Sequence, residues 1–165
     1  MANTNWRNGF RPVGNAKISY FEVAGSQTFK VGDPVYLSSG GLVTIATTST
    51  DSLCGIAAQD CASLAASTLV AVWADPEQIF EGQCAGTGTG ATAVYTCATA
   101  GSCYDMTTTN GTGDWEINES ASTEDNVKVV GIGTDPATGQ TSADGANQRL
   151  RFKIHPESHQ LAGVD

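Results

Sequence analysis

Basic residues are missing from the middle of this chain: residues 31–127 contain no Lys or Arg but hold twelve acidic residues. All eight basic residues lie in the first thirty or the last thirty-eight positions, and the net charge is −9. A surface this acidic repels nucleic acid, so nucleic-acid binding is not expected. One interpretation is that the acidic residues keep an exposed face solvated. The other is that the separation of charge lets the basic start of the chain bind an acidic partner. The charge pattern leaves both readings open.

Long apolar segments are also missing. No stretch approaches the roughly eighteen consecutive apolar residues that a membrane-spanning helix requires, so no contact with a membrane is expected. The first seven residues have no apolar core, which argues against a signal peptide. We therefore expect the protein to be made and retained in a cytoplasm.

The side chains that build active sites are scarce. Only two histidines occur, and in His155-Pro156-Glu157-Ser158-His159 the proline favours a surface turn over a metal-binding helix. The chain contains no phosphate-binding loop, no nucleophile elbow and no dinucleotide-binding glycine pattern. We expect no enzymatic activity, no metal and no cofactor.

The five cysteines form no Cys-x-x-Cys pair, so a zinc site is not expected. Cys97 and Cys103 flank a loop of small residues and could form a disulfide across a hairpin. The alternative is that the cysteines are buried, inert thiols that pack as small hydrophobic side chains. An odd number leaves at least one thiol outside any intramolecular pair.

The composition favours strands and turns. Glycine contributes 19 residues, charged residues make up only 15%, and β-branched threonine is abundant. Short segments with turn signals between them predict an all-β fold, a small β-barrel or sandwich of about nine short strands. A single helical turn is expected at 60–66. The expected strands lie within 18–24, 30–37, 42–46, 53–58, 67–74, 93–97, 114–118, 127–132 and 149–154.

The last of these strands has the strictest pattern. In residues 149–154 three basic side chains, Arg149, Arg151 and Lys153, alternate with three apolar ones. Alternation of this kind puts the apolar side chains on a core and the basic side chains on the opposite face. The basic face must meet water, acidic groups or a partner.

The first sixteen residues differ from the rest. Asn, Gly and Pro punctuate residues 1–16, and the apolar side chains there have no periodic partners, which predicts an extended N-terminal arm. Exposed aromatics and arginines need a surface to lie on, so the arm either docks on a partner or packs back on its own domain. Residues 17–165 are expected to form the β-barrel domain. Long Gly/Thr/Ala-rich loops or a β excursion are expected around 84–125.

Several short motifs together resemble small head proteins of tailed bacteriophages, the capsid decoration (cement) proteins. The motifs are Asn8-Gly9-Phe10-Arg11-Pro12-Val13, Val31-Gly32-Asp33-Pro34-Val35, Leu53-Cys54-Gly55-Ile56-Ala57, Val130-Gly131-Ile132 and a C-terminal run ending near His159-Gln160-Leu161.

The resemblance implies a β-barrel on the outside of an icosahedral phage head, often a homotrimer at local three-fold positions. Its partner would be the major capsid protein, and its location the exterior of the virion. An extended terminal arm would bind capsid subunits and stabilise the expanded shell. On this reading, Arg149, Arg151 and Lys153 lie at an acidic neighbour or subunit contact. The capsid-binding arm would comprise Trp6, Arg7, Phe10, Arg11 and Pro12.

Two other functions stay open. One is a different virion component, such as a head fibre, a connector or a tail-tube protein. The other is a carbohydrate-binding β-sandwich that stacks sugars on Trp73, Tyr95 and Trp115. Core packing is the better reading for Trp73, because its strand is apolar throughout, whereas Trp115 has polar neighbours and is the better candidate for exposure.

Overall fold

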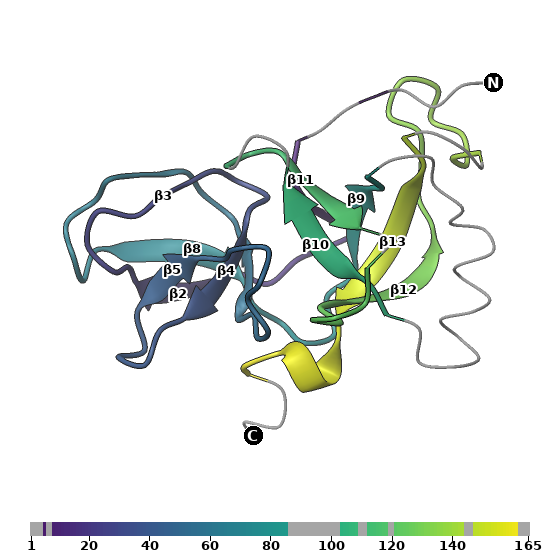
Figure 1. The fold of residues 1–165 in the computed structure, drawn as a ribbon. Coiled ribbons are helices and arrows are strands. Elements are labelled where there is room, and N and C mark those ends of the chain that lie inside the picture. The colour runs from purple at the N-terminus through teal and green to yellow at the C-terminus, as the bar shows by residue number, and fades with distance from the viewer. Residues whose placement is uncertain are drawn as a thin grey trace.

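The computed structural model describes residues 5, 8–85, 103–108, 112–118, 121–143 and 147–161, and these residues form an all-β fold (Figure 1). They contain one short 3-10 helix, Pro156–Ser158, after the last strand. The strands are β1 (Arg11–Pro12), β2 (Ser19–Glu22), β3 (Thr28–Phe29), β4 (Pro34–Leu37), β5 (Val43–Ile45), β6 (Gly55–Ala57), β7 (Cys61–Ala62), β8 (Leu69–Trp73), β9 (Phe80–Gln83), β10 (Asp105–Thr108), β11 (Trp115–Asn118), β12 (Val127–Ile132) and β13 (Arg149–Ile154).

Five strands form one antiparallel sheet in the order β2-β8-β6-β4-β5. Two of the expected strands, β4 and β5, form a hairpin in it, with Tyr36 opposite Thr44 and Gly41 at a positive φ of 73° in the turn. A single bridge between Val23 and Val43 links the ends of the sheet. None of the sheets in the described residues closes into a barrel, so the architecture is consistent with a β-sandwich.

A second antiparallel sheet has the order β1-β9-β13-β12. Along β13 the predicted alternation is confirmed, because Leu150, Phe152 and Ile154 are buried on one face. The basic face is less exposed than the pattern indicates, since Arg149 is only 7% exposed. The hairpin β10–β11 and the pair β3–β7 form two further two-stranded sheets.

Two hydrophobic cores result, and Figure 1 shows the sheets that enclose them side by side. The first core lies against the four-stranded sheet and the β10–β11 hairpin, and it is rich in large side chains such as Phe80, Phe152 and Trp115. The second core lies against the inner face of the five-stranded sheet and consists mostly of valine, alanine and cysteine. Ile56 of the five-stranded sheet belongs to the first core, so the two cores share a strand.

The N-terminal segment is anchored to this junction. The Phe10 amide donates to Gly32 O at 2.8 Å, the Gly32 amide donates to Ala57 O at 2.9 Å, and β1 pairs with β9. Gly9 has a φ of 64°, and a Cβ there would lie 2.6 Å from Gly32 O, so a larger residue does not fit. Residues 8–13 therefore pack on their own domain, which is the alternative to an arm that docks elsewhere.

The strand predictions were right for the long strands and wrong for several short ones. The segments 127–132 and 149–154 match β12 and β13, whereas β1, β3, β7, β9 and β10 were not among the expected strands, and the described residues form thirteen strands where about nine were expected. The helical turn at 60–66 is wrong, because β7 pairs there with β3 and the Asp60 carboxylate accepts from the Val31 amide. The strand expected at 93–97 lies outside the described residues.

Candidate functional site

An apolar surface lies on the outer face of β2 and β8. In the described part of the chain four large hydrophobic side chains are exposed, and three of them are Ile18 (50%), Tyr20 (65%) and Leu69 (59%). Tyr20 faces Ala71 and Glu22 faces Leu69 across the two strands, so the side chains of all four residues share one face. The opposite face carries Val70 and belongs to the second core. We call Ile18, Tyr20 and Leu69 the β2–β8 face.

This face borders the β2 edge of the sheet, which the bridge between Val23 and Val43 closes at one end. Val23 donates its amide to Thr68 on the β8 side, and Ala24 donates to Val43 on the other side. Since these directions alternate along a strand, the backbone groups of Ile18 and Tyr20 also point away from β8, beyond the end of β2 that is bridged to β5. An edge with exposed apolar side chains is a surface on which another chain can pack or pair.

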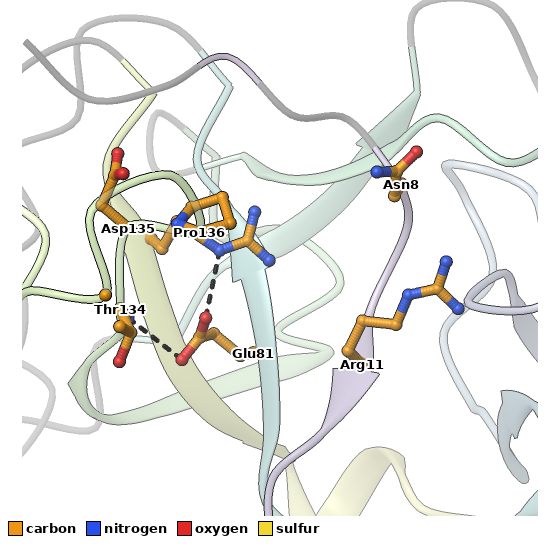
Figure 2. A pocket seen from close by; sticks show the side chains of 8 residues that line it. Asn8, Arg11, Glu81, Thr134, Asp135 and Pro136 are labelled. Atoms are coloured by element: carbon orange, nitrogen blue, oxygen red, sulfur yellow. Dashed lines mark hydrogen bonds and ion pairs between the residues drawn. The ribbon is translucent and has the colours of Figure 1, made fainter.

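A cleft of about 430 Å³ opens at the other sheet, between β1, β9 and the loop that follows β12 (Figure 2). Glu81 of β9 occupies its floor. Its Oε1 lies 3.1 Å from Arg149 Nε, and its Oε2 lies 3.4 Å from Arg151 Nε and accepts the Thr134 amide at 3.1 Å. The residues that line the cleft are Asn8, Arg11, Glu81, Thr134, Asp135, Pro136, Gly139 and Arg149.

The basic row predicted as a neighbour or subunit contact meets acids of its own chain. Glu81 holds Arg149 and Arg151, and the Glu77 carboxylate pairs with Lys153. Of the three alternatives, water, acidic groups or a partner, the structure shows acidic groups of the same chain, and the subunit contact stays a prediction. None of the three side chains needs a second subunit to find an opposite charge.

The residues predicted to bind the capsid do not form one surface. Phe10 is fully buried in the first core, with its ring centroid 4.9 Å from that of Phe152, so its predicted role as a surface contact is wrong. Arg11 is exposed beside the cleft, and Pro12 is half-buried. Trp6 and Arg7 lie outside the described residues.

The cysteines in the described residues are buried. Cys54 is fully buried, and burial raises the pKa of its thiol to about 12, which leaves it protonated and inert. The Cys61 thiol is also buried and donates to Gln27 O at 3.2 Å. Cys103 is buried, whereas Cys97 lies outside the described residues, so their predicted disulfide stays a prediction.

The C-terminal histidines were expected in a surface turn, and this is right only for part of the segment. His155 caps the 3-10 helix, but His159 is 5% exposed, because its backbone bridges to Leu53. Burial lowers the pKa of His159, while the charge of Asp75 opposes that shift. Its Nδ1 accepts from the Leu161 amide at 3.1 Å, so the residue has a structural role in the C-terminal segment.

The aromatic residues proposed as sugar platforms are largely unavailable. Trp115 is 2% exposed and lies in the first core, so the expectation of its exposure is wrong. It faces Thr108 across the β10–β11 hairpin, and that hairpin covers the core. Trp73 is half-buried and packs against the same core, and Tyr95 lies outside the described residues.

The β2–β8 face was missed by the sequence analysis, although a signal for it exists. Ile18 and Tyr20 lie on one face of β2 while Phe21 and Val23 lie on the other, so the segment is apolar on both faces. A strand at the edge of a sheet needs only one apolar face for its own core. The second apolar face indicates a further contact.

Across the described ranges, no group of three or more His, Cys, Asp or Glu side chains could hold a metal ion. No helix in those ranges is long and apolar enough to cross a membrane. No protein-family model matches the chain, and no curated protein matches it either.

Proposed function

We propose that this chain is a structural, non-catalytic protein of a tailed-bacteriophage head, which binds the outer surface of the icosahedral capsid and stabilises its lattice. The observation that carries the proposal is the exposed apolar β2–β8 face at the β2 edge of the five-stranded sheet. Three of the four exposed large hydrophobic side chains of the described residues gather there. Clustered apolar exposure of this kind marks a protein-binding surface.

The resemblance to decoration proteins supplies the identity of the partner, and the motifs that carry it lie together. Phe10, Gly32 and Ala57 belong to three of those motifs, and backbone hydrogen bonds join them at the junction of the two cores. These contacts hold the motifs together inside the fold, so the binding role rests on the exposed face.

Binding of this kind stabilises a capsid by mass action. A protein that binds only the expanded lattice shifts the equilibrium toward that lattice. If each copy, or each homotrimer of copies, contacts neighbouring capsid subunits, many weak contacts add up through avidity. The binding surface on the chain then needs no deep pocket and no catalytic group.

Co-sedimentation with expanded phage heads that lack this protein tests the proposal. The wild-type chain should pellet with the heads, and the double variant Tyr20→Ser, Leu69→Ser should lose at least tenfold in affinity. Val130→Ser is the matched control, because Val130 is the fourth exposed hydrophobic residue and lies on the other sheet. Failure of the wild-type chain to bind heads would overturn the proposal, and equal binding by the double variant would remove the β2–β8 face from it.

Neither alternative function is favoured by a described residue. A carbohydrate-binding sandwich loses Trp115 to the core. A head fibre, connector or tail-tube protein would use the same kind of surface, and its copy number in the virion distinguishes it from a decoration protein.

A further inference from the structure

We propose that the cleft beside Arg11 binds an acidic peptide segment of a partner protein, with one carboxylate on the Arg11 guanidinium and an apolar side chain against Pro136. The proposal deepens the proposed function and rests on it for the identity of the partner, the capsid protein. The chemistry of the cleft rests on the geometry alone.

One arginine beside the cleft has no acidic partner among the described residues. Arg11, Glu81 and Arg151 stand directly opposite one another on the neighbouring strands β1, β9 and β13. Both carboxylate oxygens of Glu81 are taken up by Arg149, Arg151 and the Thr134 amide. Opposite charges in cross-strand positions normally pair. Here the Glu81 carboxylate instead turns toward Arg149 and Arg151 on β13, and away from Arg11 on β1.

Arg11 is therefore a guanidinium without a partner. In the described residues no hydrogen bond or ion pair to its side chain occurs, and no dashed line reaches it in Figure 2. Figure 2 shows Arg11 and Asp135 on opposite sides of the cleft, with Glu81 between them. Among the described residues, Arg149 and Arg151 pair with Glu81, and Arg11 is the arginine at the cleft with no ion pair.

The position of Asp135 restricts the ligand. Its Oδ1 accepts from the amides of Ala137 and Thr138 at 2.9 and 3.0 Å, which fixes the carboxylate in the loop. A second acidic group on that side would be repelled. The cleft therefore suits a ligand with one acid at the Arg11 and Asn8 side and an uncharged group at the loop.

The walls of the cleft favour a peptide over a free anion. The geometry of a guanidinium suits carboxylate and phosphate equally well, because its planar fork can donate two parallel hydrogen bonds to either group. The Pro136 ring and Gly139 offer an apolar surface that an inorganic anion cannot use. A volume of about 430 Å³ lies in the range of ligand sites and holds about two side chains.

Chemical-shift titration of the isotope-labelled full chain provides the test, with three probes. The first is the blocked dipeptide acetyl-Leu-Glu-amide, the second its neutral isostere acetyl-Leu-Gln-amide, and the third inorganic phosphate. The acidic dipeptide should shift the signals of Asn8, Arg11, Thr134 and Gly139 in a saturable way. The neutral dipeptide should bind at least tenfold more weakly, and phosphate should bind more weakly than the acidic dipeptide.

Two variants assign the binding to Arg11. Arg11→Gln should abolish the response, and Arg11→Lys, which keeps the charge but loses the planar fork, should weaken it severalfold. Lys128→Gln removes the same charge from an exposed position of β12 in the same sheet and should leave binding unchanged. The Arg11 side chain is exposed and unpartnered, so both variants should keep the wild-type spectrum away from the cleft.

The outcomes separate this proposal from the proposed function. Equal binding of both dipeptides, or an unchanged response in Arg11→Gln, would overturn the acidic-peptide site. Tighter binding of phosphate would overturn it in favour of an inorganic-anion site. Head binding through the β2–β8 face would survive either result, and loss of head binding with intact dipeptide binding would overturn the proposed function alone.

Discussion

The two cores of this protein are built from different side chains, although antiparallel strands enclose both. The first core contains Phe10, Phe80, Phe152 and Trp115, and its sheet carries the paired arginines and the cleft. The second is filled by small side chains such as Val70, and its sheet carries the exposed β2–β8 face. The difference indicates a division of labour: the aromatic half fixes the N-terminal segment, and the small-residue half presents an apolar surface.

The largest effect is expected from removing an aromatic side chain of the first core. Phe152 contacts both Phe10 and Phe80 at ring-centroid distances of 4.9 and 5.8 Å, so Phe152→Ala should lower the free energy of unfolding by about 3–5 kcal/mol. Val70→Ala in the second core should lower it by only about 2 kcal/mol, since fewer methyl groups are lost. Chemical denaturation measures both changes. Equal losses would contradict the contrast between the cores.

A smaller effect is expected where the two halves meet. Asp33 is fully buried, and its carboxylate accepts from the Lys30 amide at 2.8 Å and the Gly113 amide at 2.6 Å. Asp33→Asn leaves one amide facing an NH₂ group and should lower the free energy of unfolding by about 1–3 kcal/mol. Denaturation of both proteins at one pH measures the loss.

Asp33 should also make the free energy of unfolding depend on pH. Desolvation by burial raises the pKa of Asp33 above its ordinary value of 3.8. In the window between 3.8 and the raised pKa the folded state holds the extra proton, so stability falls as the pH rises through that window. The difference in stability between wild type and Asp33→Asn should therefore shrink as the pH rises. A difference that grows with pH would show that Asp33 is stabilised as a carboxylate.

His159 in the C-terminal segment should change the pH dependence of stability in the opposite direction. Burial lowers the pKa of His159 below 6.5, so the unfolded chain takes up a proton first and stability is lost as the pH falls below 6.5. His159→Asn should reduce the fall in melting temperature between pH 7.5 and 5.5. An unchanged fall in the His159→Asn variant would contradict this role of the buried histidine.

Much of the long-strand pattern could be predicted from sequence, since β12 and β13 carry their alternation in consecutive residues. The short strands could not, because a two-residue strand such as β7 exists only through its partner β3, far away in sequence. The burial of Phe10 has the same cause: its amide is bonded to Gly32, and nothing nearby in the chain indicates that contact. The unpaired state of Arg11 depends on which way Glu81 turns, which no pattern specifies.

The smallest effect on stability is expected on the β2–β8 face. Tyr20 is 65% exposed, so Tyr20→Ser should change the free energy of unfolding by no more than about 0.5 kcal/mol. If the face serves binding, the same variant should weaken attachment to phage heads strongly. A large loss of stability in denaturation would instead make Tyr20 a structural residue.

The proposed function is tested most directly by counting copies of the protein in purified virus particles with quantitative mass spectrometry. Hundreds of copies per particle, in a fixed ratio to the major capsid protein, are the predicted result. A handful of copies would assign the protein to the tail or to a single vertex. Its absence from the particles would contradict a role in the virion.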